Sequence, residues 1–452
     1  MVKRLTVAAC CIVLLTSVGT GRGEPLTLDW NAVWKLALEK NESIAAAKDA
    51  VARAGHLVGE AYAGALPTVN FQGAFQHYFE VPSSILHLPA SMSPNNQPMR
   101  IKTQFGSENS VLLSLQLNQP LWVAGKIGLA LEIAKRYREL SDLGVAVSRA
   151  ELRLSLTKVF YSTLLAEEYL KVSREALAQA ERLRNRTQAL FDQGMVSEYD
   201  LIRARVAVAN LQPQVVQAQS SLNSAYRALK NMIGIDVDRE IVLEGSLKGG
   251  SEPPSDYRSA VRKALENRRE LRQLDLQGEL YERQFQIERR SVRLPNLFLG
   301  LKWESMAQSE DLDLKKYEFL SGWSGTISVQ IPLFDGWASH HRAEKALVDL
   351  RSVRRKKTVL QRGIKLQVYQ ALSDYEKASK ELEAAMETLH QAEKGLQIAE
   401  VRYDEGVGTQ LEVLDAQLQV NRSRVNVLQA RFNQLIARAE ADRAIGDDSA
   451  TE

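Results

Sequence analysis

Apolar positions along the chain follow two periods, and the chain switches between them more than once. Residues 26–65 carry apolar side chains at helical spacing, and after Pro67 the period becomes two. Strict alternation over about ten residues predicts a β-strand with one apolar and one polar face. Four segments alternate in this way, at about 67–82, 109–121, 295–304 and 322–333.

Each pair of predicted strands is followed by a very long helical pattern. Apolar residues recur in alternating steps of four and three, which is the spacing of coiled coils. The first return helix shows it from Leu201 through Ala204 and Val208 to Leu229. In the second return helix the predicted seam is Leu411, Leu414, Leu418, Asn421, Val425, Leu428, Phe432, Leu435 and Ala439. These patterns predict two long helical hairpins, at about 125–232 and 337–445. Outgoing helices of roughly 100 Å are long enough to cross a compartment.

The two halves of the chain carry the same landmarks in the same order. Phe191 to Gly194 is echoed by Tyr403 to Gly406, and Pro120 to Trp122 is echoed by Pro332 to Phe334. A duplication explains the match. We therefore predict a first repeat at 24–235, a linker at 236–254, a second repeat at 255–446 and a short C-terminal tail at 447–452.

The N-terminus has the layout of a secretory signal peptide, which we place at residues 1–23. Basic residues precede an apolar run from Leu5 to Val18, and small residues follow it. The only two cysteines, Cys10 and Cys11, lie inside this run, so the mature chain has no thiol. A second interpretation is that residues 7–10 form a lipobox and Cys10 becomes a lipidated N-terminus. Because the apolar run continues well beyond Cys10, ordinary cleavage is favoured.

The strand faces distinguish a membrane sheet from a sheet half-buried on a soluble core. Across all four segments the polar face carries mainly Asn, Gln, Ser, Thr and Lys, as a wet lumen would require. Aromatic residues gather near the strand ends, as at a lipid–water interface, with Trp122, Phe334 and Trp337 toward one end and Trp303 and Trp323 toward the other. Both features favour a membrane sheet over a sheet half-buried on a soluble core.

Four strands cannot close a barrel, and an open sheet edge is not tolerated in lipid. Membrane barrels begin at about eight strands, so several copies of the chain must contribute to one wall. The pattern predicts an oligomer without fixing the number of copies. Residues 83–107, rich in Pro, Ser and Asn, are predicted to be an extracellular loop.

Composition and motifs argue against several classes of function. The 58 basic and 55 acidic residues nearly balance, which gives no indication of nucleic-acid binding. No Gly-rich phosphate loop, nucleophile elbow or metal-ligand motif is present, so we predict neither an enzyme nor a cofactor or metal site. The pair His340 and His341 lacks further ligands at suitable spacing, which favours interface polarity over a metal site.

Together, the signal peptide, the duplicated half, the strand pairs and the long helical hairpins resemble the TolC-like outer-membrane efflux proteins. The strongest local motifs are the two hairpin tips, Gly194 to Leu201 and Gly406 to Ala416. The resemblance implies a mainly α fold with a small β part, in which three copies build a twelve-stranded transmembrane β barrel continued by a periplasmic α barrel. It also implies a Gram-negative outer membrane, contact with its lipid, a periplasmic adaptor protein and an inner-membrane transporter.

The resemblance also assigns residues at the tips. Glu412 and Asp415 fall where the family places acidic rings at the periplasmic constriction, and Tyr403 falls in the network that restrains the closed tip. The family's basic partner would fall at Gly408, which cannot supply it. For Glu412 the alternative is a solvated acid in the first helical turn, where it suits the helix dipole. The implied adaptor-contacting residues are Gly194, Ser197, Asp200, Gly406, Gly408 and Thr409, and Ser197 and Thr409 are also predicted N-caps.

The predicted function is therefore the exit duct of a tripartite efflux or type I secretion system. A secreted coiled-coil scaffold or a periplasmic adaptor is the alternative. An adaptor would have one helical hairpin inserted in soluble β domains, whereas this chain alternates two hairpins with membrane-like strands.

Overall fold

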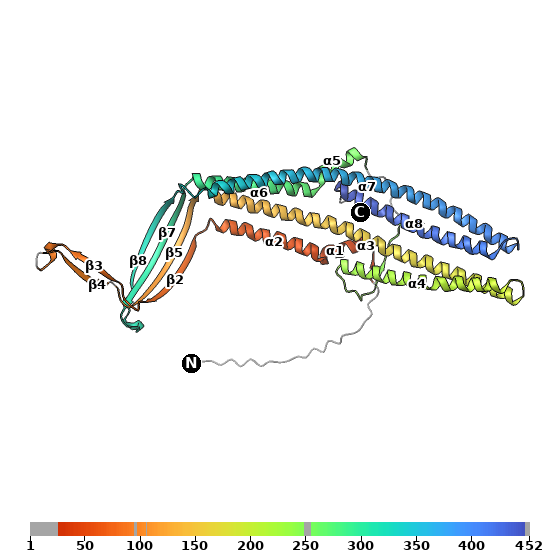
Figure 1. Cartoon of the computed structure of the whole chain (residues 1–452), viewed down its shortest axis with the longest axis horizontal. Coiled ribbons are helices and arrows are strands. Elements are labelled where there is room, and N and C mark those ends of the chain that lie inside the picture. Colours follow the sequence, from red (N-terminus) through yellow and green to blue (C-terminus); the bar gives the residue numbers. More distant parts are fainter. Residues whose placement is uncertain (1–25, 95–96, 105, 248–254, 448–452) are drawn as a thin grey trace, which may run out of the picture.

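A computed structural model describes residues 26–94, 97–104, 106–247 and 255–447. The molecule is elongated, with a β-sheet at one end and two helical tips at the other (Figure 1). The predicted signal peptide and residues 448–452 of the predicted tail lie outside the described residues. Among the helices that are described, none combines the length and the apolar character needed to cross a bilayer.

The two repeats have the same order of elements. The first contains α1 (Trp30–Lys40), α2 (Glu42–Ala63), β2 (Thr68–His77), β5 (Asn109–Val123), α3 (Lys126–Asp192) and α4 (Glu198–Met232). The second contains α5 (Tyr257–Asn267), α6 (Arg269–Arg293), β7 (Asn296–Ser309), β8 (Leu320–Gln330), α7 (Ala338–Asp404) and α8 (Gln410–Ile445). The mainly helical fold with a small β part is the one that the sequence predicted.

The four long strands form one antiparallel sheet in the order β2-β5-β7-β8, so that β2 and β8 are its edges. The pairing register places apolar residues beside apolar residues and polar residues beside polar residues across all four strands. One row contains Phe71, Leu115, Trp303 and Trp323, and the row beside it contains Asn70, Gln116, Lys302 and Ser324. The predicted apolar and polar faces are therefore confirmed. In the single chain the apolar face is bare, and Phe71 and Trp323 are 68% and 78% exposed.

Two segments predicted to be irregular contain strands. Within residues 83–107, β3 (Ser83–Leu88) and β4 (Met99–Gln104) form a hairpin that projects beyond the sheet (Figure 1), with the short 3-10 turn Ala90–Met92 between them. Within the predicted linker, β6 (Ile241–Leu243) pairs in parallel with β1 (Leu26–Leu28). The linker thus contributes to the fold of the first repeat. A second 3-10 turn, Leu314–Lys316, lies between β7 and β8.

The long helices α3 and α7 span the helical part of the molecule and change partners along the way. Near the sheet, α3 packs against α2 and α6, and α6 packs against α7 (Figure 1). Toward the tips, α3 packs against α4 and α8, and α8 packs against α7. Each long helix has 67 residues, or about 100 Å at 1.5 Å per residue. The distance between sheet and tips follows from these two helices.

The seam predicted for α8 packs within the chain only in part, where Leu428 and Leu435 contact the core of the first repeat. Leu411 and Leu418 are 49% and 44% exposed. The buried face is two residues out of phase and contains Val413, Val420, Val427, Ala430 and Ala437. Because α8 carries two apolar heptad stripes, its sequence could not show which one packs inside the chain. In a single copy the second stripe is exposed near the tip, at Leu411 and Leu418, and half-buried further along α8.

Both repeats are held at mid-height by a core around the middle of the long helix. In the first repeat Val33 of α1 and Leu229 of α4 pack with Leu156 and Phe160 of α3. In the second, Ala260 and Ala264 of α5 and Ile445 of α8 pack with Ile364 and Val368 of α7. Equivalent elements thus bury equivalent surfaces, as a duplication requires.

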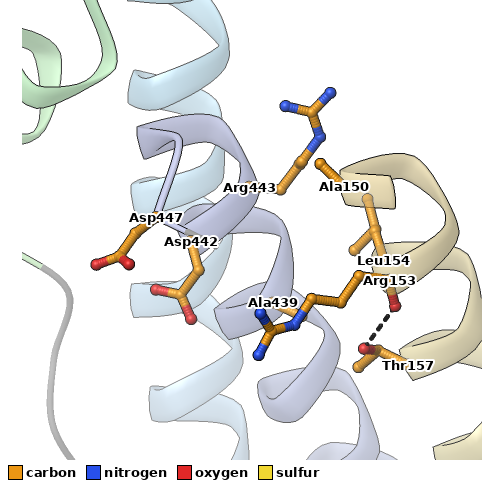
Figure 2. A pocket seen from close by; sticks show the side chains of 8 residues that line it. All are labelled: Ala150, Arg153, Leu154, Thr157, Ala439, Asp442, Arg443 and Asp447. Carbon is orange, nitrogen blue, oxygen red and sulfur yellow. Dashed lines mark hydrogen bonds between the residues drawn. The ribbon is translucent and has the colours of Figure 1, made fainter. Parts of the chain in front are cut away.

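Polar contacts between α3 and α8 join one repeat to the other at this height. Figure 2 shows the cleft, in which the side chain of Arg153 of α3 extends toward Ala439 and Asp442 of α8, while the Thr157 hydroxyl donates to the backbone oxygen of Arg153. Asp442 is 7% exposed and forms an ion pair with Arg438 at 3.1 Å, and burial raises its pKa. Beside the cleft, Lys158 and Glu440 form an ion pair of 2.6 Å.

Glu270, at the start of α6, links α6 to the end of α8. Its carboxylate accepts hydrogen bonds from Arg268 at 3.0 Å and from Arg443 at 2.9 Å. Burial acts to raise the pKa of Glu270, but the hydrogen bond from Arg268 and the charges of both arginines outweigh burial and lower the pKa to about 2. The carboxylate is therefore held in its charged form across the physiological range.

We expect Glu270→Gln to lower the free energy of unfolding by about 3 kcal/mol at pH 7, since each pKa unit corresponds to about 1.4 kcal/mol. A lowered pKa stabilises above the ordinary carboxyl range, and this stabilisation is lost as pH falls through the folded-state pKa. The difference between the proteins should thus shrink between about pH 4.5 and 2. Guanidinium unfolding followed by circular dichroism measures it, with the exposed Glu266→Gln as control. A constant difference across this range would contradict the assignment.

Candidate functional site at the helical tips

The two hairpin tips are built on the same turn. After α3 and α7 end, Gly194 and Gly406 adopt φ values of 73° and 74°, in the left-handed region that favours glycine. The residues that follow close the turn, with the N–H of Met195 donating to the oxygen of Leu190 at 2.9 Å and that of Val407 to Arg402 at 3.0 Å. Sequence identity at the two glycines thus reflects a shared backbone requirement.

Each return helix begins at the predicted cap. The hydroxyl oxygen of Ser197 accepts from the N–H of Asp200, whose carboxylate accepts from the N–H of Ser197 in return. Thr409 accepts from the N–H of Glu412 at 3.3 Å. Capping by Ser197 and Thr409 is confirmed, and it ties Asp200 and Glu412 to the first turn of their helices.

Gly408 is enclosed by the end of α7, which explains the absence of a side chain there. A Cβ atom at this position would lie 3.0 Å from the Cβ atom of Arg402 and from the backbone N of Tyr403. The N–H of Gly408 also donates to the oxygen of Arg402 at 2.8 Å. The second tip therefore closes against its own outgoing helix at a position where Val196 stands in the first tip.

The basic partner of Glu412 comes from the outgoing helix of the same hairpin. The Nε atom of Arg402 lies 3.6 Å from a carboxylate oxygen of Glu412. Asp415, one turn further along α8, is exposed and makes no hydrogen bond or ion pair to any residue that the structure describes. The structure thus brings Glu412 into the turn beside Tyr403 and leaves Asp415 outside it.

Two residues of α3 hold the second tip against the first repeat. Arg186 forms an ion pair with Asp404 at 2.7 Å, and its guanidinium lies 5.6 Å from the centre of the Tyr403 ring. The neighbouring Thr187 accepts a hydrogen bond of 2.9 Å from the side-chain amide of Gln410, and both side chains are buried. These three contacts join hairpins that are far apart in sequence.

Sequence reasoning did not single out Arg186, Thr187 or Gln410, although the repeat contained a signal. The residues that correspond to Arg186 and Thr187 in the second half are Ile398 and Ala399. The first repeat thus has polar residues where the second repeat has apolar ones. Within one chain, the polar residues contact the tip of the other hairpin. Between α3 and the second hairpin lies an open groove of about 360 Å³, lined by Arg182 and Arg186 on one side and by Glu400, Tyr403 and Asp404 on the other.

The predicted interface aromatics lie in two groups. Trp122, Phe334 and Trp337 lie at the end of the sheet that joins the long helices. Trp303 pairs with Trp323 nearer the middle of β7. Trp337 has a φ of 65°, which a bulky side chain rarely adopts, and its ring stacks edge-on between Phe334 and His340. Among the described residues no three metal-ligating side chains come together.

Comparison with known proteins gives the same assignment for both repeats. The family model described as outer membrane efflux protein matches residues 33–235 and 260–447. The cobalt-zinc-cadmium resistance protein CzcC of Cupriavidus metallidurans is 26% identical over 67% of this chain and 69% of its own length. The outer membrane protein TolC of Vibrio cholerae is 20% identical over 64% of this chain and 66% of its own length.

Solved structures share the fold along nearly the whole chain. The outer membrane protein VceC from Vibrio cholerae superposes with a TM-score of 0.70 at 15% identity, covering 92% of this chain and 95% of VceC. CusC, whose structures describe transmembrane channel formation, gives a TM-score of 0.72 at 16% identity, covering 92% and 91%. The duplicated hairpins, the sheet and the tips are thus shared with channel proteins, and the chain belongs to the outer membrane efflux protein family.

Proposed function

We propose that this protein is the outer-membrane exit duct of a tripartite efflux or type I secretion system. The observation that carries the proposal is the sheet, whose apolar face is bare and whose two edges are open at one end of helices about 100 Å long. Such a sheet suits a membrane, and helices of that length reach from the membrane across the periplasm. Efflux fits the family assignment.

Ring closure between copies supplies the missing hydrogen bonds of the sheet. Because an antiparallel sheet of four strands has edges that run in opposite directions, β8 of one copy can pair in antiparallel fashion with β2 of the next. Three copies give twelve strands and a closed wall, the arrangement that the family resemblance implies. The exposed end of this α8 stripe, with Leu411 and Leu418, is then available for a neighbouring copy.

The tips are the proposed docking surface for a periplasmic adaptor, which couples the duct to an inner-membrane transporter. Beside the predicted contacts Gly194, Ser197, Asp200, Gly406, Gly408 and Thr409, the tips expose large apolar side chains. Met195, Tyr199 and Val407 are 69%, 64% and 70% exposed. Apolar side chains gathered at the end of a long hairpin favour a protein partner. Because CzcC is named for cobalt, zinc and cadmium, divalent cations are the first cargo class to test.

The function is tested by extraction and by electrical recording. The duct should fractionate with the outer membrane, require detergent, migrate as a heat-sensitive trimer and conduct ions in planar bilayers. The alternative, a periplasmic scaffold or adaptor without a channel, would be a freely soluble protein. A soluble monomer without conductance would contradict the proposal.

We expect Arg186→Gln to favour the open duct, because the ion pair of Arg186 with Asp404 holds the second tip against α3 and, in the proposed mechanism, opening moves the tip away. An exposed ion pair contributes about 0.5 kcal/mol, so three copies lose about 1.5 kcal/mol and the open probability rises roughly tenfold. Single-channel recording measures it. The control is Arg184→Gln, because Arg184 hydrogen-bonds only its neighbour Asn185. Equal open probabilities in the two variants would show that the Arg186–Asp404 ion pair does not stabilise the closed duct.

We expect the double variant Glu412→Gln with Asp415→Asn to lose cation selectivity and to change single-channel conductance. Repetition around the axis converts each carboxylate into a ring that attracts cations. Reversal potentials in a salt gradient measure the selectivity. The control is Asp192→Asn with Glu198→Gln in the first tip, which removes the same charge from exposed positions. If both double variants behave like the unaltered duct, the acids do not line the constriction.

A further inference from the structure

Three arginines lie together in the last turn and a half of α6, immediately before the membrane strand β7. Arg289, Arg290 and Arg293 are exposed and line an open groove of about 240 Å³ with Gln286 and Leu294. Only residues 294 and 295 separate α6 from the start of β7. The groove therefore lies at the junction of helix and sheet.

These arginines differ from others in α6 and from its N-cap residue Arg268. Arg268, Arg272 and Arg283 form ion pairs with Glu270, Glu279 and Glu132, respectively. No described acid lies within ion-pair distance of Arg289, Arg290 or Arg293, and the contact of Arg289 is with the ring of Phe285 at 5.6 Å. A helix C-terminus favours cations by about 0.3–1 kcal/mol each. That effect accounts for one arginine more readily than for three that repel one another.

The register of the sheet fixes the height of the groove. Trp122 lies opposite Leu297, and Val123 lies opposite Asn296, so the helix-proximal ends of β5 and β7 coincide. A Cβ atom at Gly125 would lie 2.9 Å from the Nη1 atom of Arg290, which places this guanidinium against the strand–helix corner of the first repeat. The groove is thus level with the aromatic residues at this end of the sheet.

That height matches a lipid headgroup layer. The headgroup region adds about 5–7 Å on each side of the hydrocarbon core. With a rise of about 1.5 Å per residue, Arg289 and Arg293 differ by about 6 Å along the helix. If β7 enters the hydrocarbon near Asn296, the three guanidinium groups span the headgroups of the periplasmic leaflet.

We propose that this arginine groove binds the phosphate of an anionic phospholipid headgroup in the periplasmic leaflet, such as that of phosphatidylglycerol. Guanidinium groups donate paired hydrogen bonds that fit phosphate oxygens. Leu294 and Phe285 provide apolar surface beside the charges, which suits the glycerol and the first acyl carbons. The proposal rests on the proposed function, because it requires the sheet to span the membrane.

The test compares the unaltered duct with R289Q/R290Q/R293Q in detergent. The matched control is R351Q/R354Q/R355Q, which removes three exposed arginines of α7 that lie well away from the sheet. Native mass spectrometry counts bound phosphatidylglycerol, phosphatidylcholine and inorganic phosphate. We expect one phosphatidylglycerol per chain in the unaltered duct and in the control, and at least tenfold weaker binding in the groove variant. Phosphatidylcholine should bind weakly to all three.

Equal binding of phosphatidylglycerol by the three proteins would overturn the proposal. Displacement of the lipid by an equal concentration of inorganic phosphate would also overturn it, because the site would then be one for free anions. Conductance of each protein in planar bilayers is recorded in parallel. If the unaltered protein conducts and the groove variant binds lipid as the unaltered protein does, only the proposed lipid site is refuted. If the unaltered protein does not conduct, the proposed function is refuted.

Discussion

The unpaired backbone N–H and C=O groups along the outer edges of β2 and β8 impose the main constraint on the rest of the structure. Each edge strand is ten or eleven residues long and has a neighbour on one side only. In hydrocarbon an unsatisfied N–H or C=O costs several kcal/mol, so a single chain cannot leave these edges unpaired in a membrane. An even number of strands per copy solves the problem, because the two edges run in opposite directions and can meet. In the proposed duct, oligomerisation is therefore a condition for membrane insertion, and the helices would inherit the symmetry of the closed sheet.

Duplication gives the two repeats equivalent cores and equivalent turns, but their tips differ in side-chain contacts. The cores around Phe160 and Ile364 bury equivalent surfaces, and the turns at Gly194 and Gly406 share one backbone conformation. Near the tips the two repeats differ at positions that make contacts. Arg186 and Thr187 replace the apolar pair Ile398 and Ala399, and Gly408 replaces Val196. These changes let α3 hold the second hairpin, whereas the side chains of Ile398 and Ala399 on α7 cannot form equivalent polar contacts. The two tips therefore share a backbone turn but differ in the side chains that hold them.

The sequence predicted the features that depend on one segment at a time. Strand faces follow from alternation alone, so an apolar and a polar face could be predicted before the strand register was known. Caps at Ser197 and Thr409 follow from local hydrogen bonding. Features that depend on pairs of distant segments were missed. Arg186 meets Asp404 only because α3 lies beside the second hairpin, and α8 buries Val420 instead of Leu418 because both of its stripes are apolar.

The central claim is that copies of the chain close the sheet by pairing β2 with β8. The only cysteines of the sequence, Cys10 and Cys11, precede the described residues. Disulfide cross-linking can therefore use Gln72→Cys in β2 combined in turn with Ser324→Cys, Thr326→Cys or Ser328→Cys in β8, all on the polar face. The account predicts that at least one combination yields chains linked to one another, in a ladder that ends at three. Absence of interchain disulfides in all three folded, membrane-inserted variants would contradict it.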